Sequence, residues 1–150
     1  MERSRRATLL FLSRLPESEI SRPRTQGSWS VKDSLAHIAA WEEEGTHRLE
    51  LIARGRGRRI RFYDDMRAVD RFNARAVGRA RTVPLARLLR RLARARRRLI
   101  EALRKLPPEA LRDPAHEVPV VGWLPEFAWT HERSHLREIR EWWRSRERAP

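Results

Sequence analysis

Residues 85–106 read LARLLRRLARARRRLIEALRKL, and this stretch decides the fold class. Its leucines recur at spacings of three and four residues: Leu85, Leu88, Leu89, Leu92, Leu99, Leu103 and Leu106. They therefore fall on one face of an α-helix, while arginines cover the other face. Burying such a face at about 25 cal/mol per Å² contributes several kcal/mol of stability, provided that other helices pack on it. The stretch predicts one long helix of a helical bundle, ended by Pro107 and Pro108.

A second amphipathic helix has clear start and stop signals. Ser30 fits the N-cap position, and Asp33 stands three residues later, where its carboxylate can accept a hydrogen bond from the cap amide. Gly55 and Gly57 predict the end of this helix. We expect its apolar face to consist of Val31, Leu35, Ile38, Gly45, Leu49 and Ile52.

Three further helices complete the pattern. Residues 2–14 and 124–146 predict the first and last helices, and residues 64–79 predict a shorter one. Thr82 is the expected cap of the leucine-rich helix, with Pro84 in its first turn. The sequence therefore predicts an all-α fold with four main helices and one additional short helix.

The rest of the chain fits the same class. The segments 16–29, 54–61 and 109–121 are expected connectors, and no segment alternates as a strand does. The length of 150 residues is that of one domain, so we expect a single helical-bundle domain over 1–150. No apolar run reaches the length of a secretory or membrane-spanning helix, so we expect a cytoplasmic protein without membrane contact.

The charge is strongly basic and comes almost entirely from arginine. The formal net charge is +14, and Lys32 and Lys105 are the only lysines. Such a charge raises the expectation of a nucleic-acid or other anionic partner. An arginine bias of this kind, with alanine and leucine as the main apolar residues, is also what a GC-rich genome produces on any helical surface, and we favour that explanation.

The last predicted helix carries the residues that point to chemistry. Its expected core stripe contains polar residues among apolar ones: Leu124, Phe127, His131, His135, Glu138 and Trp142. His131 and His135 are four residues apart, so both imidazoles can reach one metal ion. His37, on the flank of the second helix, is the best candidate for a third ligand. His47 and His116 are weaker candidates, because they fall on an outer face and in a loop.

Two other interpretations of these histidines remain open on the residues alone. The letters H-E-R-S-H at 131–135 satisfy the zinc-peptidase pattern HExxH, in which Glu132 would be the general base. Alternatively, His131 is a hydrogen-bonded core residue, and His135 pairs with Glu138 or Glu132 without any metal. The chain has no cysteine, so thiolate ligands and cysteine nucleophiles are excluded.

Three segments resemble one known family. They are WSVKDSLAHIAAW at 29–41, Phe72-Asn73 followed by TVPL at 82–85, and WTHERSHLREI at 129–139. Together they resemble the DinB-like superfamily, in the branch called DfsB-like, over about residues 29–146. The resemblance implies a four-helix bundle in which His37, His131 and His135 bind a divalent metal ion, zinc, nickel or iron. It assigns no required role to Glu132.

The resemblance also implies a range of functions. Some relatives are thiol-dependent transferases or isomerases that use mycothiol or bacillithiol, and others have no known activity. One hypothesis is therefore a metal-dependent transferase acting on a small molecule, with Trp41, Phe127 and Trp129 lining its pocket. The alternative is a non-enzymatic bundle that binds a small molecule or a polyanion. A polyanion would contact the basic loop, whose arginines are Arg54, Arg56, Arg58, Arg59 and Arg61. A homodimer is a further expectation.

Overall fold

The computed structural model describes all residues except 64, 114–117 and 149–150. In this part of the chain helices dominate, and the β structure is limited to an isolated bridge between Gln26 and Trp29. The α-helices are α1 (Glu2–Leu12), α2 (Glu17–Ser21), α3 (Val31–Ala53), α4 (Met66–Ala80), α5 (Leu85–Arg104), α6 (Val120–Phe127) and α7 (Trp129–Glu147). Two short 3-10 turns, η1 (Gly57–Arg59) and η2 (Pro108–Arg112), lie in the connections.

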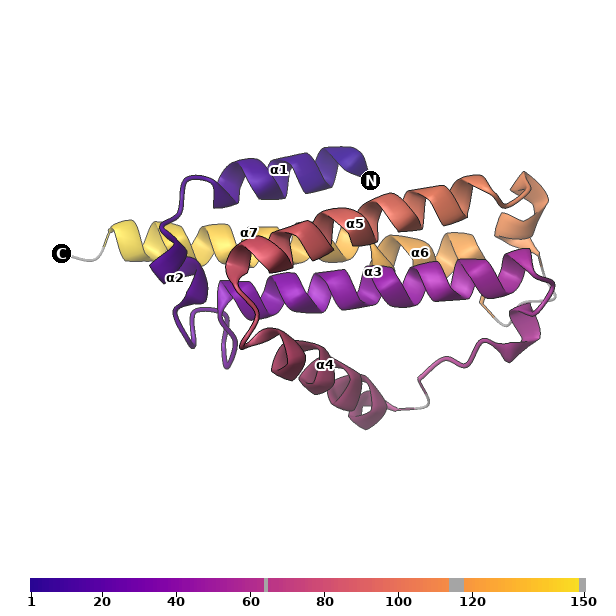
Figure 1. Ribbon diagram of the computed structural model, residues 1–150, viewed down its shortest axis with the longest axis horizontal. Coiled ribbons are helices and arrows are strands. Elements are labelled where there is room, and N and C mark those ends of the chain that lie inside the picture. The colour runs from indigo at the N-terminus through magenta and orange to yellow at the C-terminus, as the bar shows by residue number, and fades with distance from the viewer. Residues whose placement is uncertain (64, 114–117, 149–150) are drawn as a thin grey trace.

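The bundle is formed by α1, α3, α5 and α7, which lie side by side in Figure 1. The connection through α4 carries the chain back along the bundle, so α3 and α5 run in the same direction. Helix α3 packs against α2, α4, α5, α6 and α7, which makes it the central helix, while α1 packs on α7. The predicted all-α bundle with an additional short helix is confirmed.

The start and end of α3 follow the local sequence. The Ser30 side chain accepts a hydrogen bond from the Asp33 amide at 3.0 Å, and the Asp33 carboxylate accepts one from the Ser30 amide at 3.0 Å. These reciprocal bonds satisfy two amides that the first turn leaves without a helical partner. Gly55 follows the helix with a φ of +67°, a left-handed conformation that glycine adopts without steric cost.

Several predicted boundaries were wrong. Part of the expected 16–29 connector forms α2, which places Ile20 in the core beside α3. Pro84, not Thr82, is the N-cap of α5, and no side chain caps that helix. The Asp65 side chain caps α4 by accepting from the Ala68 amide at 2.7 Å. The residues at which these helices begin therefore depend on helix packing and on the fixed φ of proline, and cap propensity alone does not predict them.

The predicted single helix over 124–146 is wrong as well. Ala128 has φ −131° and ψ −100°, which separates α6 from α7. The phase of the buried stripe changes at this break, so counting 100° per residue across it gives the wrong face. On α7 the buried residues are Glu132, Leu136 and Ile139, whereas Glu138 is exposed.

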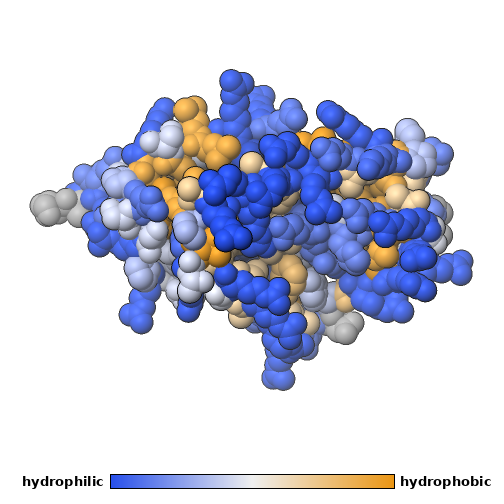
Figure 2. Space-filling view, viewed as in Figure 1, coloured by the Kyte–Doolittle hydropathy of each residue, from blue (hydrophilic) through white to orange (hydrophobic). Residues whose placement is uncertain are grey.

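Two apolar clusters share the core, and a polar layer lies between them along the bundle. The first includes Leu12, Leu35, Leu88, Leu92 and Ile139, and the second includes Leu49, Leu99, Leu106, Trp123 and Leu124. The face in Figure 2 is mostly hydrophilic, with an apolar patch where α1 lies. Among the described residues, no helix has the length and apolarity needed to cross a bilayer.

Candidate metal centre

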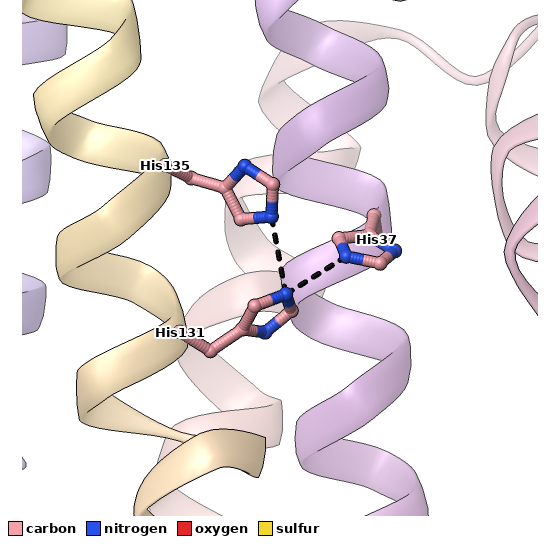
Figure 3. Close-up of side chains that lie close together, drawn as sticks. All are labelled: His37, His131 and His135. Carbon is pink, nitrogen blue, oxygen red and sulfur yellow. Dashed lines mark hydrogen bonds between the residues drawn. The ribbon is translucent and has the colours of Figure 1, made fainter. Parts of the chain in front are cut away.

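Three imidazoles from two helices converge on one point. The Nε2 atom of His131 lies 2.8 Å from Nε2 of His37 and 3.1 Å from Nε2 of His135. One ligand atom from each ring lies within 4.8 Å of the other two. Figure 3 shows His131 and His135 reaching from α7 toward His37 on α3. Residues separated by almost a hundred positions in sequence therefore form a single cluster, which we call the histidine triad.

The helices explain this placement. His131 and His135 are four residues apart in α7, so they project from the same face on successive turns. His37 belongs to the buried face of α3 and is only 5% exposed. The sequence placed His37 at the flank of its helix and did not predict this burial. Neighbours cover α3 on nearly every side, so a flank position is buried as well. The Trp29 ring packs against His37, with ring centroids 4.9 Å apart.

The surroundings keep these imidazoles neutral. Burial, reinforced by the charges that the other two rings would carry, lowers the pKa of His37 to about 3. Burial lowers the pKa of His131 to about 4, with a further contribution from His135. Burial also lowers the pKa of His135, although the Glu138 carboxylate opposes this effect. A neutral imidazole offers the lone pair that a metal ion requires.

The arrangement of nitrogens fits a metal ion better than a set of hydrogen bonds. A neutral Nε2 has either one lone pair or one N–H, so His131 can make one linear hydrogen bond but has two close nitrogen neighbours. A cation between the rings would use all three lone pairs. Zinc–nitrogen bonds of about 2.0–2.1 Å place tetrahedral ligands roughly 3.3 Å apart. Two nitrogen separations are slightly shorter, at 2.8 and 3.1 Å, and all three ligand atoms lie within 4.8 Å of one another.

Of the three Nδ1 atoms, on the opposite side of each ring from Nε2, only that of His135 has a polar partner among the described residues. Nδ1 of His135 lies 3.3 Å from a Glu138 carboxylate oxygen, which favours the tautomer with Nε2 free for a metal. This pairing with Glu138 was one of the metal-free interpretations, and it is equally compatible with a ligating Nε2. Nδ1 of His37 and Nδ1 of His131 are buried and have no hydrogen-bond partner among the described residues.

The other histidines do not join the triad. His47 is exposed on the outer face of α3, as its position in the sequence predicts. His116 lies outside the described residues. Within the described ranges, the triad is the only group of three or more metal-binding side chains close enough to share an ion.

The zinc-peptidase interpretation of HERSH is wrong. Glu132, the required general base, is fully buried and accepts hydrogen bonds from Ser4 and from two arginines, Arg5 and Arg96. A carboxylate engaged in this way is not free to activate a water at the triad. The sequence pattern matched in letters only, since consecutive residues of a helix point in different directions.

Aromatic side chains surround the triad. The Trp41 ring lies 6.3 Å from both His37 and His131, and it packs on Phe127 at 4.7 Å. The Trp41 indole N–H donates to Asn73 Oδ1 at 3.0 Å, which ties α4 to α3 near the site. Asn73 was noted only as part of a family motif, and no local pattern predicts this contact. Trp129, a predicted pocket residue, packs instead against the second apolar cluster.

The amino-acid sequence matches one known protein family. A family model described as "DinB superfamily" matches residues 1–139. No curated protein and no solved structure gives a significant match.

Proposed function

Because this chain belongs to the DinB superfamily, we propose that it binds one divalent metal ion through the Nε2 atoms of His37, His131 and His135. The observation that carries the proposal is the convergence of three neutral imidazoles at separations of 2.8 and 3.1 Å. Imidazole ligands suit zinc, nickel and iron, whereas magnesium and calcium prefer oxygen. The family match, over residues 1–139, includes all three of these histidines.

We further propose that the bound metal serves a transferase that uses a low-molecular-weight thiol. Three neutral nitrogen ligands leave the charge of a divalent ion uncompensated and leave at least one position open. A metal ion held there would act as a Lewis acid and stabilise a thiolate. The chain has no cysteine, so the thiol has to come from a separate molecule such as mycothiol or bacillithiol.

The protein's own residues would hold and shield this site. Glu138 orients His135, and burial keeps the three rings unprotonated. The rings of Trp29 and Trp41 cover His37 and limit the access of water to the triad. A thiol that enters next to these aromatic surfaces would lose its proton to solvent and attack an electrophilic carbon of a small molecule. A sulfur–carbon bond would form while the bond from that carbon to the leaving group breaks, and the leaving group would depart with the electron pair.

Metal analysis of untagged protein tests the metal site. We expect about one equivalent of zinc, nickel or iron in the wild type and a loss of most of it in His131→Ala, with unchanged helical circular dichroism. His47→Ala is the matched control, since His47 is an exposed histidine of α3 outside the triad. Full metal retention in His131→Ala would contradict the ligand assignment.

Thiol binding is tested separately with cobalt. In the Co²⁺-substituted protein, adding mycothiol or bacillithiol should produce a sulfur-to-metal charge-transfer band. A protein that binds metal but shows no such band with either thiol would keep the metal proposal and remove the transferase one.

One observation favours a second candidate function, the binding of a polyanion. The basic loop follows α3, and its arginines are all exposed: Arg54, Arg56, Arg58, Arg59 and Arg61. Contacts with phosphates release counterions, so binding of a nucleic acid would weaken steeply as salt is raised. Replacing Arg58 and Arg59 by Gln should reduce both the affinity and its salt dependence in a filter-binding assay, and no binding at low salt would reject this function.

A further inference from the structure

We infer that Arg5 and Arg96 position the histidine triad, because they bridge a buried carboxylate on each of the two helices that carry its histidines. We call Arg5, Glu42, Arg96 and Glu132 the charge quartet. The inference rests on the proposed function, because the triad has to be positioned only if it binds a metal. The contacts within the charge quartet do not depend on a metal.

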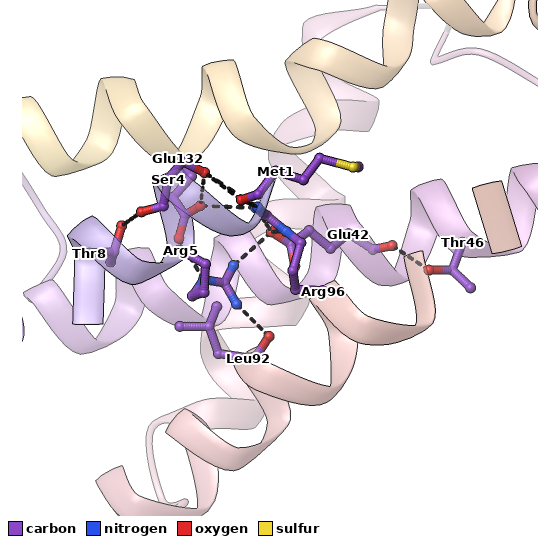
Figure 4. Close-up of polar contacts among 9 residues, drawn as sticks. All are labelled: Met1, Ser4, Arg5, Thr8, Glu42, Thr46, Leu92, Arg96 and Glu132. Atoms are coloured by element: carbon purple, nitrogen blue, oxygen red, sulfur yellow. Dashed lines mark hydrogen bonds and ion pairs between the residues drawn. The ribbon is translucent and has the colours of Figure 1, made fainter. Parts of the chain in front are cut away.

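The four helices of the bundle contribute one residue each to the quartet: Arg5 from α1, Glu42 from α3, Arg96 from α5 and Glu132 from α7 (Figure 4). Their exposed fractions lie between 0% and 6%. The two positive and two negative charges cancel, so the layer is neutral although it is buried.

Each arginine contacts both carboxylates. Arg5 donates from Nε to Glu132 at 2.5 Å and from Nη2 to Glu42 at 2.7 Å. Arg96 Nη2 donates to Glu42 at 2.5 Å and to Glu132 at 2.9 Å. Glu42 and Glu132 are therefore held together by two planar guanidinium groups rather than by direct contact.

The outer nitrogens of the arginines are also engaged. Arg5 Nη1 donates to the Leu92 carbonyl at 2.5 Å, and Arg96 Nη1 donates to the Met1 carbonyl. The Ser4 hydroxyl adds a bond of 2.6 Å to Glu132. These bonds tie the guanidinium groups to the backbones of α1 and α5, so the carboxylates are held relative to the whole bundle.

The carboxylates are close to the metal-site histidines along their helices. Glu132 is the residue after His131 on α7, and Glu42 follows His37 by five residues on α3. At about 1.5 Å per residue, the quartet is within about 8 Å of the triad along either helix axis. A change in the spacing or register of α3 and α7 at the quartet would therefore be transmitted to the separation of His37 and His131.

Apolar packing alone would specify this register less sharply. The quartet lies between the two apolar clusters, whose leucines and alanines can tolerate small shifts of one helix along another. Guanidinium–carboxylate bonds are directional and fix both distance and angle. Buried ion pairs of this kind contribute little net stability compared with apolar residues of similar size. We therefore assign the quartet the role of fixing one register of α3 against α7.

Two variants test the inference. Arg5→Lys keeps the charge but replaces the planar fork by a single ammonium. The ammonium cannot reproduce the fixed planar geometry in which Arg5 bonds Glu132, Glu42 and the Leu92 carbonyl from three separate nitrogens. The matched control is Arg91→Lys, because Arg91 also joins α5 to α3, through Glu43 at 2.7 Å, but on the surface and away from the triad. The second variant replaces the quartet by apolar residues together: Arg5→Met, Glu42→Leu, Arg96→Met and Glu132→Leu.

Two readouts are needed, and one of them uses no metal. The first is the Co²⁺ affinity and the ligand-field spectrum, which report the geometry of the three nitrogens. The second is the distance distribution between spin labels on His47→Cys and Arg133→Cys in metal-free protein. Both positions are exposed, on α3 and α7, and the chain has no other cysteine.

The expected results separate positioning from stability. In Arg5→Lys and in the apolar variant, Co²⁺ affinity should fall about tenfold or more and the label distances should broaden, with helical content retained. Arg91→Lys should stay within about twofold of the wild type, as exposed ion pairs generally contribute little.

Other outcomes would overturn the inference. A folded Arg5→Lys or apolar variant with wild-type cobalt affinity and label distances would do so. So would failure of both variants to fold, because the quartet would then serve stability alone. If the wild type binds no metal, the proposed function fails, and the label distances still decide whether the quartet sets the spacing of α3 and α7.

Discussion

Adjacent residues of α7 have opposite roles in this protein. His131 points into the triad and is held neutral, whereas Glu132 points into the charge quartet, where Arg5 and Arg96 lower the pKa of its carboxyl against the effect of burial. The 100° turn between successive helical residues makes this division possible. One short stretch of helix thus supplies both a proposed ligand and a buried anion that anchors the same helix.

At the residue scale, we predict that Glu138 contributes to metal binding without being a ligand. Glu138→Ala removes the carboxylate 3.3 Å from His135 Nδ1, which should free the ring to change tautomer and weaken metal binding by about tenfold. Competition titration with a chelator measures this change. Glu141→Ala is the control, an exposed glutamate of the same helix. Equal affinity in both variants would show that the contact with Glu138 has no effect on the metal.

At the scale of the helices, the neighbours of each helix determine whether its polar residues are buried or exposed. α3 is covered on nearly every side, so it buries polar residues such as Ser34, His37, Glu42 and Arg48 together with its apolar stripe. His37 and Glu42 find partners on other helices. Ser34 bonds the Ser30 carbonyl, and Arg48 bonds Glu44 of the same helix. By contrast, α5 exposes most of its arginines and buries most of its leucines, as its sequence predicts. Arg96 is an exception, because it is buried in the charge quartet.

Two helical glycines give a matched prediction at this scale. A Cβ at Gly78 of α4 would meet no atom within 4 Å, so Gly78→Ala should raise the free energy of unfolding by about 1 kcal/mol through helix propensity. A Cβ at Gly45 of α3 would lie 3.2 Å from Leu99 Cδ1, so Gly45→Ala should lose this gain to crowding. Urea denaturation of both variants checks the difference, and an equal gain at both positions would contradict the close packing of α3 on α5.

Across the whole molecule, the bundle has an apolar, polar and apolar sequence of layers along its length. The quartet and the triad lie between the two apolar clusters, and the quartet connects α1, α3, α5 and α7 (Figure 4). Separate polar contacts join the outer parts, such as Arg146 with Glu19, which connects α7 to α2 at 2.9 Å. Folding of the bundle and assembly of the triad are therefore expected to be one cooperative event.

The triad should make the metal-free protein sensitive to acid. The pKa of His37 is about 3 and that of His131 about 4 in the folded chain, against about 6.5 when unfolded. Well above pH 6.5 these rings are neutral in both the folded and the unfolded state. As the pH falls below 6.5, only the unfolded chain takes up protons, so the free energy of unfolding should decrease by up to about 1.4 kcal/mol per pH unit for each histidine.

Urea denaturation of metal-free protein between about pH 7 and about pH 5 measures this effect, in a range above the ordinary titration of carboxylates. The double variant His37→Gln and His131→Gln, which cannot titrate at these positions, should show a smaller decrease. Parallel pH dependence in the wild type and the double variant would mean that the triad is not buried as described.

Local physics made part of the structure predictable. The capping box at Ser30 and Asp33, the end of α3 at Gly55 and the leucine face of α5 depend on nearby residues only, and these predictions are confirmed. The pairing of His131 with His135 follows from helical spacing. His37 was the best candidate for the third ligand from its place on the second helix, and the family resemblance then implied the same residue.

Tertiary structure decided the rest. The amino-acid sequence by itself determined a bundle of amphipathic helices and a pair of histidines on one of them, because helix caps and apolar faces are short-range properties. The break at Ala128, the burial of Glu132 and the convergence of His37 with the other two rings depend on which helices meet. Glu42 and Glu132 are buried because arginines from other helices meet them, and those partners lie far away in the chain.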